Sequence, residues 1–326
     1  MRKAIVTGGA GFIGSHMVDH LIKKKYSVII IDNLTGGHLK NLRHLKNKKI
    51  KIIKKDIRNL DIKDKAFKGT KYLFHFAGIG DIVPSIERPK DYMEVNVIGT
   101  INMLELARFH KIKKFIYAAS SSCYGLAKTP TSETHSIDPK YPYALSKYQG
   151  EQAVFHWSKL YKLKADSVCI FNAYGPRVRT TGAYGAVFGV FFKQILSKKP
   201  LTVVGDGNQK RDFIYVTDVA NAFYHVAKLK SSGNRFNVGA GNPIKILNLV
   251  KILNSKYEFI PKRPGEPDIT FANIKKITKY TKWRPSISFK DGVNEMMKSI
   301  NSWKDAPLWN KKTIKKATST WFKYLK

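Results

Sequence analysis

The chain has 326 residues, of which 43% are hydrophobic, so it can bury a sizeable core and lacks the composition of a disordered protein. The net charge of +36 comes mainly from lysines spread along the sequence, without a helix-turn-helix, zinc-finger or aromatic RNA-binding motif. The apolar runs are too short to span a bilayer, and the two cysteines suit neither a disulfide framework nor a metal site.

These features predict a cytoplasmic protein without a metal, which binds neither nucleic acid nor a membrane. The sequence begins with MRKAIVTGG, which passes directly into a strand and a glycine turn and leaves no room for a signal peptide. The positive field would help to attract a small anionic substrate.

The first half of the chain alternates strand and helix patterns. Short apolar runs predict buried strands at residues 3–8, 27–32, 50–56, 71–78, 113–120 and 165–172. Apolar residues at helical spacing predict helices at residues 12–24, 91–109 and 142–163. Such alternation implies right-handed crossovers, so we expect an α/β fold with a Rossmann-type, doubly wound parallel sheet. Ligands of these sheets bind beyond the carboxyl ends of the strands.

A glycine-rich turn, VTGGAGFIG, connects the first predicted strand to the first helix. It lets backbone N–H groups approach a pyrophosphate at the helix N-terminus. Asp32 ends the second strand, where an acid accepts hydrogen bonds from ribose hydroxyls and repels a 2′-phosphate, which favours NAD over NADP. The NAD contacts expected at this and the following strand ends are Gly8, Gly11, Phe12, Ile13, Gly14, Asp32, Asn33, Asp56, Ile57, Phe76, Ala77 and Gly78.

Tyr143 and Lys147 lie one turn apart in the helix predicted at 142–163, so they share a face. An adjacent ammonium is expected to stabilise the phenolate and lower the pKa of the phenol from about 10 towards neutrality. The positive nicotinamide would act in the same direction. Such a tyrosine can take a proton from a substrate hydroxyl while hydride leaves the same carbon. Ser120, at the end of the fifth strand, can hydrogen-bond that oxygen.

From residue 173 onward proline and glycine become frequent, and loops separate the helical stretches. We expect residues 1–172 to form an NAD-binding Rossmann domain into which some later segments interleave. Residues 173–303 should form a smaller substrate-binding region, and residues 304–326 a basic C-terminal helix. One face of that helix, which packs either on its own domain or on a second subunit, carries Ile314, Ala317, Trp321 and Leu325.

The sequence resembles the extended short-chain dehydrogenases/reductases, and within them the sugar-nucleotide epimerase/dehydratase group, over residues 1 to about 300. The matching stretches are TGGAGFIGSH, IDNL, KKDIRN, HFAG, VNVIGT, AASSSCYG, YPYALSK, FNAYGPR, GDGNQKRDFIYVTDVA, FNVGAG and RPGEPD. The resemblance implies that Tyr143 is the general base, Lys147 its electrostatic partner and Ser120 the third catalytic residue. Four residues of these stretches are also expected to contact NAD, namely Asn96, Tyr143, Lys147 and Phe171.

The two residues after Ser120 bear on the reaction. Family members that eliminate water usually carry an acid pair there, and decarboxylating members usually carry a glutamate. Here Ser121 and Ser122 occupy these positions and cannot serve as acids at neutral pH. The resemblance therefore implies oxidation to a 4-keto sugar and re-reduction on the opposite face, which is the reaction of the 4-epimerases. The neighbouring Cys123 is expected to be a small buried residue.

The resemblance also implies a nucleotide-sugar site. Asn172 would contact the diphosphate-sugar region, and Arg211 and Arg263 would clamp the diphosphate, since guanidinium groups suit bidentate anion recognition. Glu266 stands where an aspartate that holds the nucleotide ribose is frequent, and Asn273 stands where the family usually has aspartate. The remaining predicted substrate contacts are Ser120, Ser121, Ser122, Tyr143 and Thr270.

Thr270 bears on the size of the sugar. In the 4-epimerases, the residue two positions before the alanine of the (W/F)A(D/N) motif lines the sugar pocket. It is tyrosine where only plain hexoses are accepted, and cysteine or serine where N-acetylated sugars fit. The small Thr270 predicts that UDP-GlcNAc or UDP-GalNAc is accepted beside UDP-glucose and UDP-galactose.

The family is usually dimeric through a four-helix bundle, so we expect a homodimer that uses the helices at 91–109 and 142–163. Two other functions remain open. The first is another enzyme of this fold, such as a nucleotide-sugar dehydratase, decarboxylase, uronate epimerase or 4-keto-forming dehydrogenase. The second is a non-catalytic NAD- or RNA-binding protein, which would not need Ser120, Tyr143 and Lys147 together.

Overall fold

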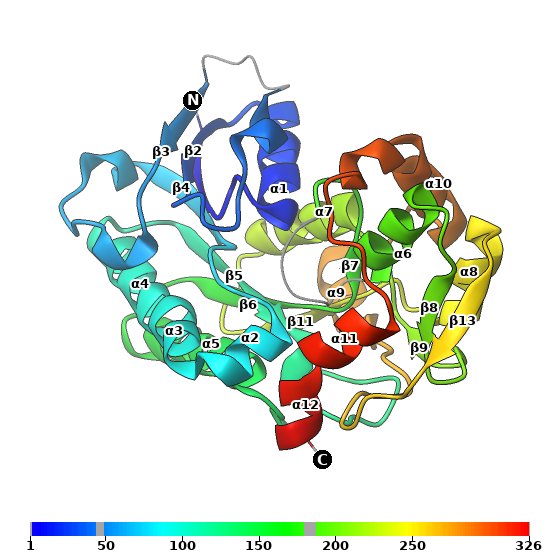
Figure 1. Ribbon diagram of the computed structural model, residues 1–326. Coiled ribbons are helices and arrows are strands. Elements are labelled where there is room, and N and C mark those ends of the chain that lie inside the picture. The colour runs from blue at the N-terminus through cyan, green and yellow to red at the C-terminus, as the bar shows by residue number, and fades with distance from the viewer. Residues whose placement is uncertain (1, 44–48, 179–186, 326) are drawn as a thin grey trace.

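The computed structural model describes residues 2–43, 49–178 and 187–325 (Figure 1). Its main sheet is parallel throughout and runs in the spatial order β3-β2-β1-β4-β5-β6-β11. The strands are β1 (Lys3–Thr7), β2 (Ser27–Ile31), β3 (Ile50–Ile53), β4 (Thr70–His75), β5 (Lys114–Ser120), β6 (Ala165–Ile170) and β11 (Arg235–Val238). The order reverses between β1 and β4, where ligands of doubly wound sheets bind. The predicted Rossmann-type fold is confirmed.

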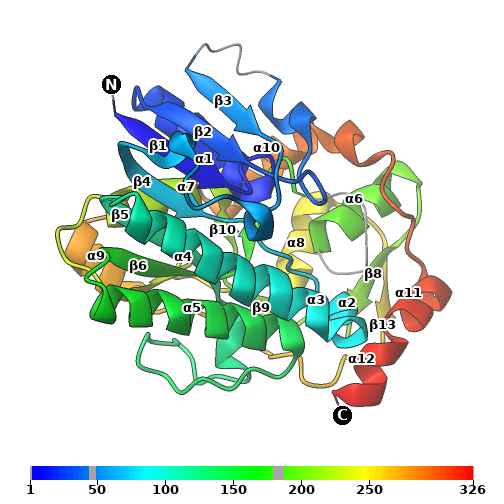
Figure 2. The ribbon, with the colours of Figure 1, turned by 90° about the vertical axis from the view of Figure 1, so that its left-hand side faces the viewer.

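Helices cover both faces of the sheet (Figures 1 and 2). The larger ones are α1 (Phe12–Lys23) and α7 (Val216–Ala227) on one face, and α4 (Gly99–Phe109) and α5 (Pro142–Leu160) on the other. Most of the predicted strands end earlier than the sequence pattern suggests. The seventh strand, β11, comes from the later part of the chain, so later segments do interleave with the first.

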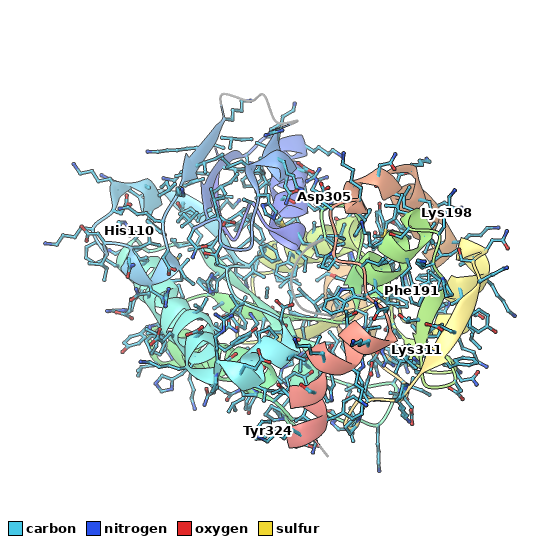
Figure 3. All side chains as sticks on the ribbon, viewed as in Figure 1. His110, Phe191, Lys198, Asp305, Lys311 and Tyr324 are labelled. Atoms are coloured by element: carbon cyan, nitrogen blue, oxygen red, sulfur yellow. The ribbon has the colours of Figure 1, made fainter. Side chains whose placement is uncertain are left out.

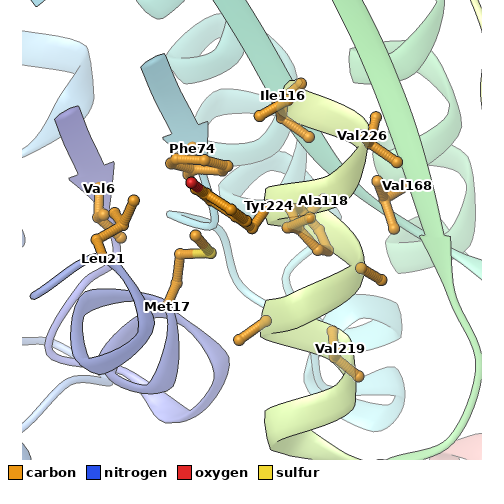
Figure 4. Packing of buried hydrophobic residues seen from close by; sticks show 14 of the residues in the cluster. Val6, Met17, Leu21, Phe74, Ile116, Ala118, Val168, Val219, Tyr224 and Val226 are labelled. Atoms are coloured by element: carbon orange, nitrogen blue, oxygen red, sulfur yellow. The ribbon is translucent and has the colours of Figure 1, made fainter. Parts of the chain in front are cut away.

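Alternation along each strand divides the core into two layers. Ala4 and Val6 of β1 face α1 and α7, whereas Ile5 between them faces the layer of α4 and α5. Figure 4 shows the first of these layers, where Met17 of α1 and Phe74 of β4 are fully buried. Each such side chain contributes about 1.5–3 kcal/mol by leaving water. This packing fixes the strand ends that carry the site.

The helix predicted at 91–109 is divided in the structure. A short helix α3 (Pro89–Met93) leads into one π-helical turn, Glu94–Ile98, and α4 begins only at Gly99. The preceding helix α2 is Ile82–Glu87. Such single π turns often occur at functional sites. Here the turn carries Asn96, which is buried.

A second core lies in the later part of the chain. Its elements are α6 (Val187–Leu196), β8 (Leu201–Val204), α8 (Ile246–Leu253), β13 (Tyr257–Ile260) and α10 (Phe289–Lys298). Short strands connect it to the rest: β7 (Ala173–Tyr174), β9 (Lys210–Arg211), β10 (Ile214–Tyr215) and β12 (Ile244–Lys245). Stacked aromatic rings, such as Tyr174 on Phe188 at 5.0 Å, fill this core. Helix α9 (Lys275–Thr281) lies back against β11.

The single C-terminal helix predicted at 304–326 is instead two short helices, α11 (Lys311–Ala317) and α12 (Ser319–Tyr324). The buried Thr318 lies between them and has non-helical backbone angles. Ile314 and Trp321 are buried against the same chain, as the predicted apolar face requires. None of the helices in the described ranges is long and apolar enough to cross a membrane.

Candidate active site

The glycine turn forms a cradle at the N-terminus of α1. Gly8 adopts a left-handed φ of +66°, and the N–H of Gly11 donates to its carbonyl oxygen at 3.0 Å. A Cβ on Gly14 would lie 2.1 Å from that same oxygen, so only glycine allows this close approach. Gly11 is the N-cap and has no side chain to cap the helix. The N–H groups of Phe12, Ile13 and Gly14 therefore point out of the helix end, where an anion would bind.

Asp32 lies beside this cradle at the end of β2. Its Oδ2 accepts from the N–H of Ala10 at 2.9 Å, and its Oδ1 accepts from the N–H of Leu34 at 2.8 Å. These bonds fix the carboxylate and leave further lone pairs for ribose hydroxyls.

Asn33 and Asp56 form a second polar group next to Asp32. Asn33 Nδ2 donates to Asp56 Oδ2 at 2.9 Å, and the Arg58 guanidinium also bonds Asp56. Hydrogen bonds from Arg58 lower the pKa of Asp56 to about 2. The side chain of Ile57 is buried on the start of α4, so this residue can reach a ligand only through its backbone.

The residues that follow β4 close the floor of the cradle. Phe76 packs its ring on Phe223 of α7 at 4.5 Å, and the N–H of Ala77 donates to Thr7 Oγ1 at 3.2 Å. Asn96 is not on the surface of the site. Its amide binds the backbone of Ile79 and the hydroxyl of Ser146, so it lies under the loop at 78–80 and ties that loop to α5.

Tyr143 and Ser120 are brought together as the sequence predicts. Ser120 ends β5, and Tyr143 lies in the first turn of α5, where the Ser120 hydroxyl acts to lower the pKa of the phenol. A Cβ on Gly80 would lie 3.7 Å from the Tyr143 hydroxyl oxygen, so the glycine keeps the space above the phenol open. Ser120 also accepts from the N–H of Ser122 at 3.3 Å, which fixes the start of the serine strip.

Lys147 is buried one helical turn from Tyr143. Its Nζ lies 4.3 Å from the centre of the Tyr117 ring, an arrangement that favours a cation. Burial lowers the pKa of Lys147 to about 8, and the negative charge of Glu151 opposes that fall. Glu151 is itself held by Ser167 and Arg235.

The predicted lowering of the tyrosine pKa is not produced by the protein's own groups. Burial raises the pKa of Tyr143, and the hydrogen bond with Ser120 only opposes this rise. The negative charge of Asp81, at the start of α2, raises it further. The physical reason is that removing the phenol from water penalises the phenolate more than its neighbours stabilise it.

A cleft of about 440 Å³ opens between the start of α2 and the serine strip, and its lining includes Gly80, Asp81 and Tyr141. The predicted residues that line it are Ser121, Ser122, Phe171, Asn172, Arg211, Arg263, Glu266 and Thr270. Side chains from distant parts of the chain join them, namely Asp81, Tyr141 and Trp321. The structure thus gathers the predicted substrate residues around one cleft, except Ser120 and Tyr143, which are not part of its lining.

Two arginines of the cleft share one carboxylate. Arg211 Nη2 donates to Glu266 Oε1 at 2.8 Å, and Arg263 Nε lies 2.8 Å from Glu266 Oε2. The guanidinium groups of Arg211 and Arg263 are therefore held side by side, which suits them for a diphosphate. Glu266 thereby orients the pair.

The side chain of Thr270 is small, and two hydrogen bonds of its hydroxyl fix its orientation. Its hydroxyl donates to Asn172 Oδ1 at 2.6 Å and accepts from the N–H of Asp212 at 3.1 Å. Asp212 is buried, and its carboxylate accepts from the N–H groups of Ala240 and Ala272, both at 2.8 Å. Asn273 makes a local turn, because its Oδ1 accepts from the N–H of Lys275 at 3.1 Å.

Sequence reasoning missed Tyr117, Glu151, Tyr141 and Trp321. The spacing of Glu151, one turn beyond Lys147, is a signal that could have identified it. Tyr141 lies two residues before Tyr143, and their rings stack at 6.4 Å. The position of Trp321 depends on the fold of the whole chain, and no local sequence pattern predicts it.

Comparison with known proteins agrees with this geometry. The sequence profile of the NAD dependent epimerase/dehydratase family matches residues 4–239, which is more than half of the chain. The chain belongs to this family. It is 36% identical over 302 residues to the putative UDP-glucose 4-epimerase of Methanocaldococcus jannaschii, covering 90% of this chain and 96% of that protein.

Two solved structures are similar to the epimerase/dehydratase chain. The UDP-N-acetylglucosamine 4-epimerase of Methanobrevibacter ruminantium M1, in complex with UDP-N-acetylmuramic acid, has a TM-score of 0.88 and 31% identity, covering 92% of this chain and 98% of that one. The UDP-glucuronic acid 4-epimerase of Bacillus cereus, with UDP-glucuronic acid and NAD, has a TM-score of 0.86 and 31% identity, covering 92% and 99%.

NAD is the cofactor of this family, and the residues present fit it. The cradle can form only because Gly8 and Gly14 lack side chains, since a Cβ would lie 2.7 Å from the Ala77 nitrogen or 2.1 Å from the Gly8 carbonyl oxygen. Asp32 supplies a fixed carboxylate at the ribose end, and Gly80 keeps the space beside Tyr143 open at the nicotinamide end.

We expect Asp32→Asn, freed of co-purified NAD, to bind NAD about tenfold more weakly or worse, because a hydrogen bond to a charged group contributes about 1.5–3 kcal/mol. The loss of charge should also reduce the preference for NAD over NADP. Isothermal titration calorimetry with both dinucleotides measures these effects. Asp61→Asn, in an exposed turn, is the control and should keep the wild-type affinities. An unchanged ratio of the two affinities in Asp32→Asn would contradict the assignment.

Proposed function

We propose that the chain catalyses NAD-dependent 4-epimerisation of a UDP-sugar. The observation that carries the proposal is the pairing of Ser120 with Tyr143 at a cleft whose serine strip, Ser121 and Ser122, has no acid. The names of the similar proteins support it, since they include 4-epimerases of UDP-glucose, UDP-glucuronate and UDP-N-acetylglucosamine.

Each of the site residues has a separate role in the proposed reaction. Tyr143 takes the proton from the C4 hydroxyl, and Ser120 donates a hydrogen bond to the same oxygen as it becomes a carbonyl. Lys147 supplies positive charge near the phenolate. The glycine turn and Asp32 would hold NAD, which would supply the acceptor and donor of the C4 hydride and a positive ring that favours the phenolate. Arg211 and Arg263 hold the diphosphate while the 4-keto sugar presents its other face to Tyr143.

A related elimination is the second candidate, because one acid does reach the phenol. Asp81 lines the cleft at the start of α2 and raises the pKa of Tyr143. It comes from a different element than the Ser121–Ser122 strip in which eliminating members usually carry their acids. If the enzyme formed a 4-keto-6-deoxy product, Asp81 would be the first candidate for the acid.

The size of Thr270 supports acceptance of an N-acetylated sugar. Its hydroxyl is used by Asn172 and Asp212, so only a methyl group of this residue remains to occupy the cleft. We include UDP-GlcNAc and UDP-GalNAc among the proposed substrates for this reason.

We also propose a homodimer built on α4 and α5. These helices lie side by side on one face of the sheet (Figure 2). The exposed apolar side chains at their ends include Ile98, Phe109, Leu160 and Tyr161. Burial of these side chains by a second copy would remove apolar surface from water.

Tyr143→Phe should reduce turnover of the best UDP-sugar by about 10²–10⁴-fold, the usual contribution of a positioned proton-transfer group. NAD should remain bound, because the substitution removes only a hydroxyl. NMR of the sugar products and the absorbance of bound dinucleotide measure the two properties. Tyr148→Phe, on the same helix, is the matched control and should keep wild-type turnover. Full activity in Tyr143→Phe would refute the phenolate mechanism.

Thr270→Tyr should abolish turnover of UDP-GalNAc while UDP-galactose is still converted, since the larger ring occupies the space of the N-acetyl group. Thr270→Ser keeps the hydroxyl that binds Asn172 and should accept both sugars. NMR of each incubation reports the C4 epimer. The proposal about sugar size fails if the wild-type protein converts UDP-galactose and leaves UDP-GalNAc untouched.

Leu160→Glu should convert the dimer to a monomer, because a charge would have to be buried between subunits. Size-exclusion chromatography with light scattering gives the mass directly. Leu39→Glu changes an exposed leucine in a different part of the chain and should leave the dimer intact. A wild-type monomer, or an unaltered Leu160→Glu dimer, would refute this interface.

A further inference from the structure

We propose that helix α12 is a wall of the substrate cleft and that Trp321 is a positioning residue for Arg263 and Tyr141. The identity of the ligand in this inference, a nucleoside diphosphate sugar, rests on the function proposed above. Helix α12 lies outside residues 4–239, which match the family profile. The sequence predicts only a packing role for the helix at 304–326.

The first observation is how Trp321 holds the loop that carries Arg263. The indole is buried and lines the cleft. Its Nε1–H donates to the carbonyl oxygen of Pro264 at 2.7 Å. The guanidinium carbon of Arg263 lies over the indole ring, 5.3 Å from its centre. A guanidinium that stacks on an aromatic face keeps its charge and loses less freedom when it binds an anion.

The second observation is a row of aromatic rings that leads to the catalytic pair. The ring of Trp321 lies 6.3 Å from that of Tyr141, and Tyr141 stacks on Tyr143 at 6.4 Å with an interplanar angle of 11°. Tyr141 lines the cleft together with Ser122 of the serine strip. The C-terminal helix therefore contacts both ends of the cleft, the diphosphate end through Arg263 and the sugar end through Tyr141.

The third observation is that α12 is fastened to the opposite side of the cleft. Thr320 Oγ1 donates to Glu87 Oε1 at 3.1 Å, at the end of α2, and the two helices are in contact (Figure 1). The start of α2 itself lines the cleft with Asp81, Ile82 and Val83. Helix α12 thus bridges the Rossmann side, through Thr320, and the loop of the smaller region, through Trp321.

These contacts predict a role in ligand binding that is separate from NAD binding. With Trp321 in place, Arg263 is oriented before the diphosphate arrives, and less freedom is lost on binding. Without the indole, both Arg263 and Tyr141 lose a packing partner. We expect Trp321→Ala to bind UDP about tenfold more weakly, because the cation–aromatic contact that orients Arg263 is lost.

The experiment compares full-length variants of the NAD-loaded protein, with UDP as the probe. Trp321→Ala removes the ring, and Trp321→Phe keeps a ring but loses the indole N–H. Tyr324→Ala is the matched control, because Tyr324 lies on the outside at the end of the same helix (Figure 3) and is 62% exposed. Calorimetry gives the UDP affinity, release of NAD on dilution gives its retention, and melting temperature reports folding.

The expected result is weaker UDP binding in Trp321→Ala, an intermediate value in Trp321→Phe and no change in Tyr324→Ala, with NAD retained in all. With a UDP-sugar that is turned over, Trp321→Ala should raise KM more than it lowers kcat. UDP should also change the tryptophan emission of the wild type, and this change should be lost in Trp321→Phe.

Three results would overturn the inference. The first is UDP affinity in Trp321→Ala equal to that of the wild type. The second is a parallel loss of UDP affinity, NAD and melting temperature, which would make Trp321 merely structural. The third is the absence of UDP binding by the wild type, which would also contradict the proposal that the substrate is a UDP-sugar. If UDP binding depends on Trp321 but no sugar is epimerised, the proposed reaction fails and this inference stands.

Discussion

Burial of the Lys147 ammonium is the constraint on which the active site depends. A charged group removed from water is costly, and the fall of the Lys147 pKa to about 8 records that cost. The Tyr117 ring lies 4.3 Å from Nζ, and the charge of Glu151 offsets part of the penalty. Glu151 needs partners of its own, and Arg235 of β11 supplies a salt bridge. The seventh strand therefore supports the helix that carries Tyr143.

The substrate wall has a comparable buried anchor in Asp212. Its carboxylate accepts backbone N–H groups from Ala240 and Ala272, which belong to two different loops. Burial raises the pKa of Asp212, while these N–H groups favour the charged form. The loops are held together in this way, and Thr270 is placed against Asn172 at the edge of the cleft. One anchor positions the proton-transfer residues and the other positions the residues around the sugar.

Much of the fold and of the site could be predicted because it follows from local sequence patterns. The glycine turn, Asp32 at a strand end and the one-turn spacing of Tyr143 and Lys147 depend on residues close together in the sequence. Their placement at one sheet edge follows from parallel topology. The pairing of β11 with β6, the break at Thr318 and the neighbourhood of Trp321 depend on contacts between distant segments. No periodicity within a short window contains that information.

The wrong prediction for the direction of the Tyr143 pKa shift also arises because local sequence patterns do not show burial. The spacing of Tyr143 and Lys147 indicates a cation near the phenol, but only the fold shows that Lys147 is buried and Tyr143 half-buried. Burial acts against both charged forms at once, since it raises the pKa of a phenol and lowers that of an ammonium. Proximity in sequence therefore predicted a downward shift of the Tyr143 pKa, whereas burial raises this pKa.

The two arginines at the diphosphate end show how binding and turning of a sugar can coexist. Glu266 binds both Arg211 and Arg263, so in the proposed reaction a diphosphate would meet two oriented guanidinium groups whose charge one carboxylate only partly offsets. An epimerase must let the sugar expose either face, so the fixed contacts have to lie on the nucleotide and not on the hexose. The stacking of Arg263 on Trp321 adds stiffness at that fixed end. Thr270, Ser121 and Ser122 supply small side chains to the cleft, where the sugar of the proposed substrate would turn.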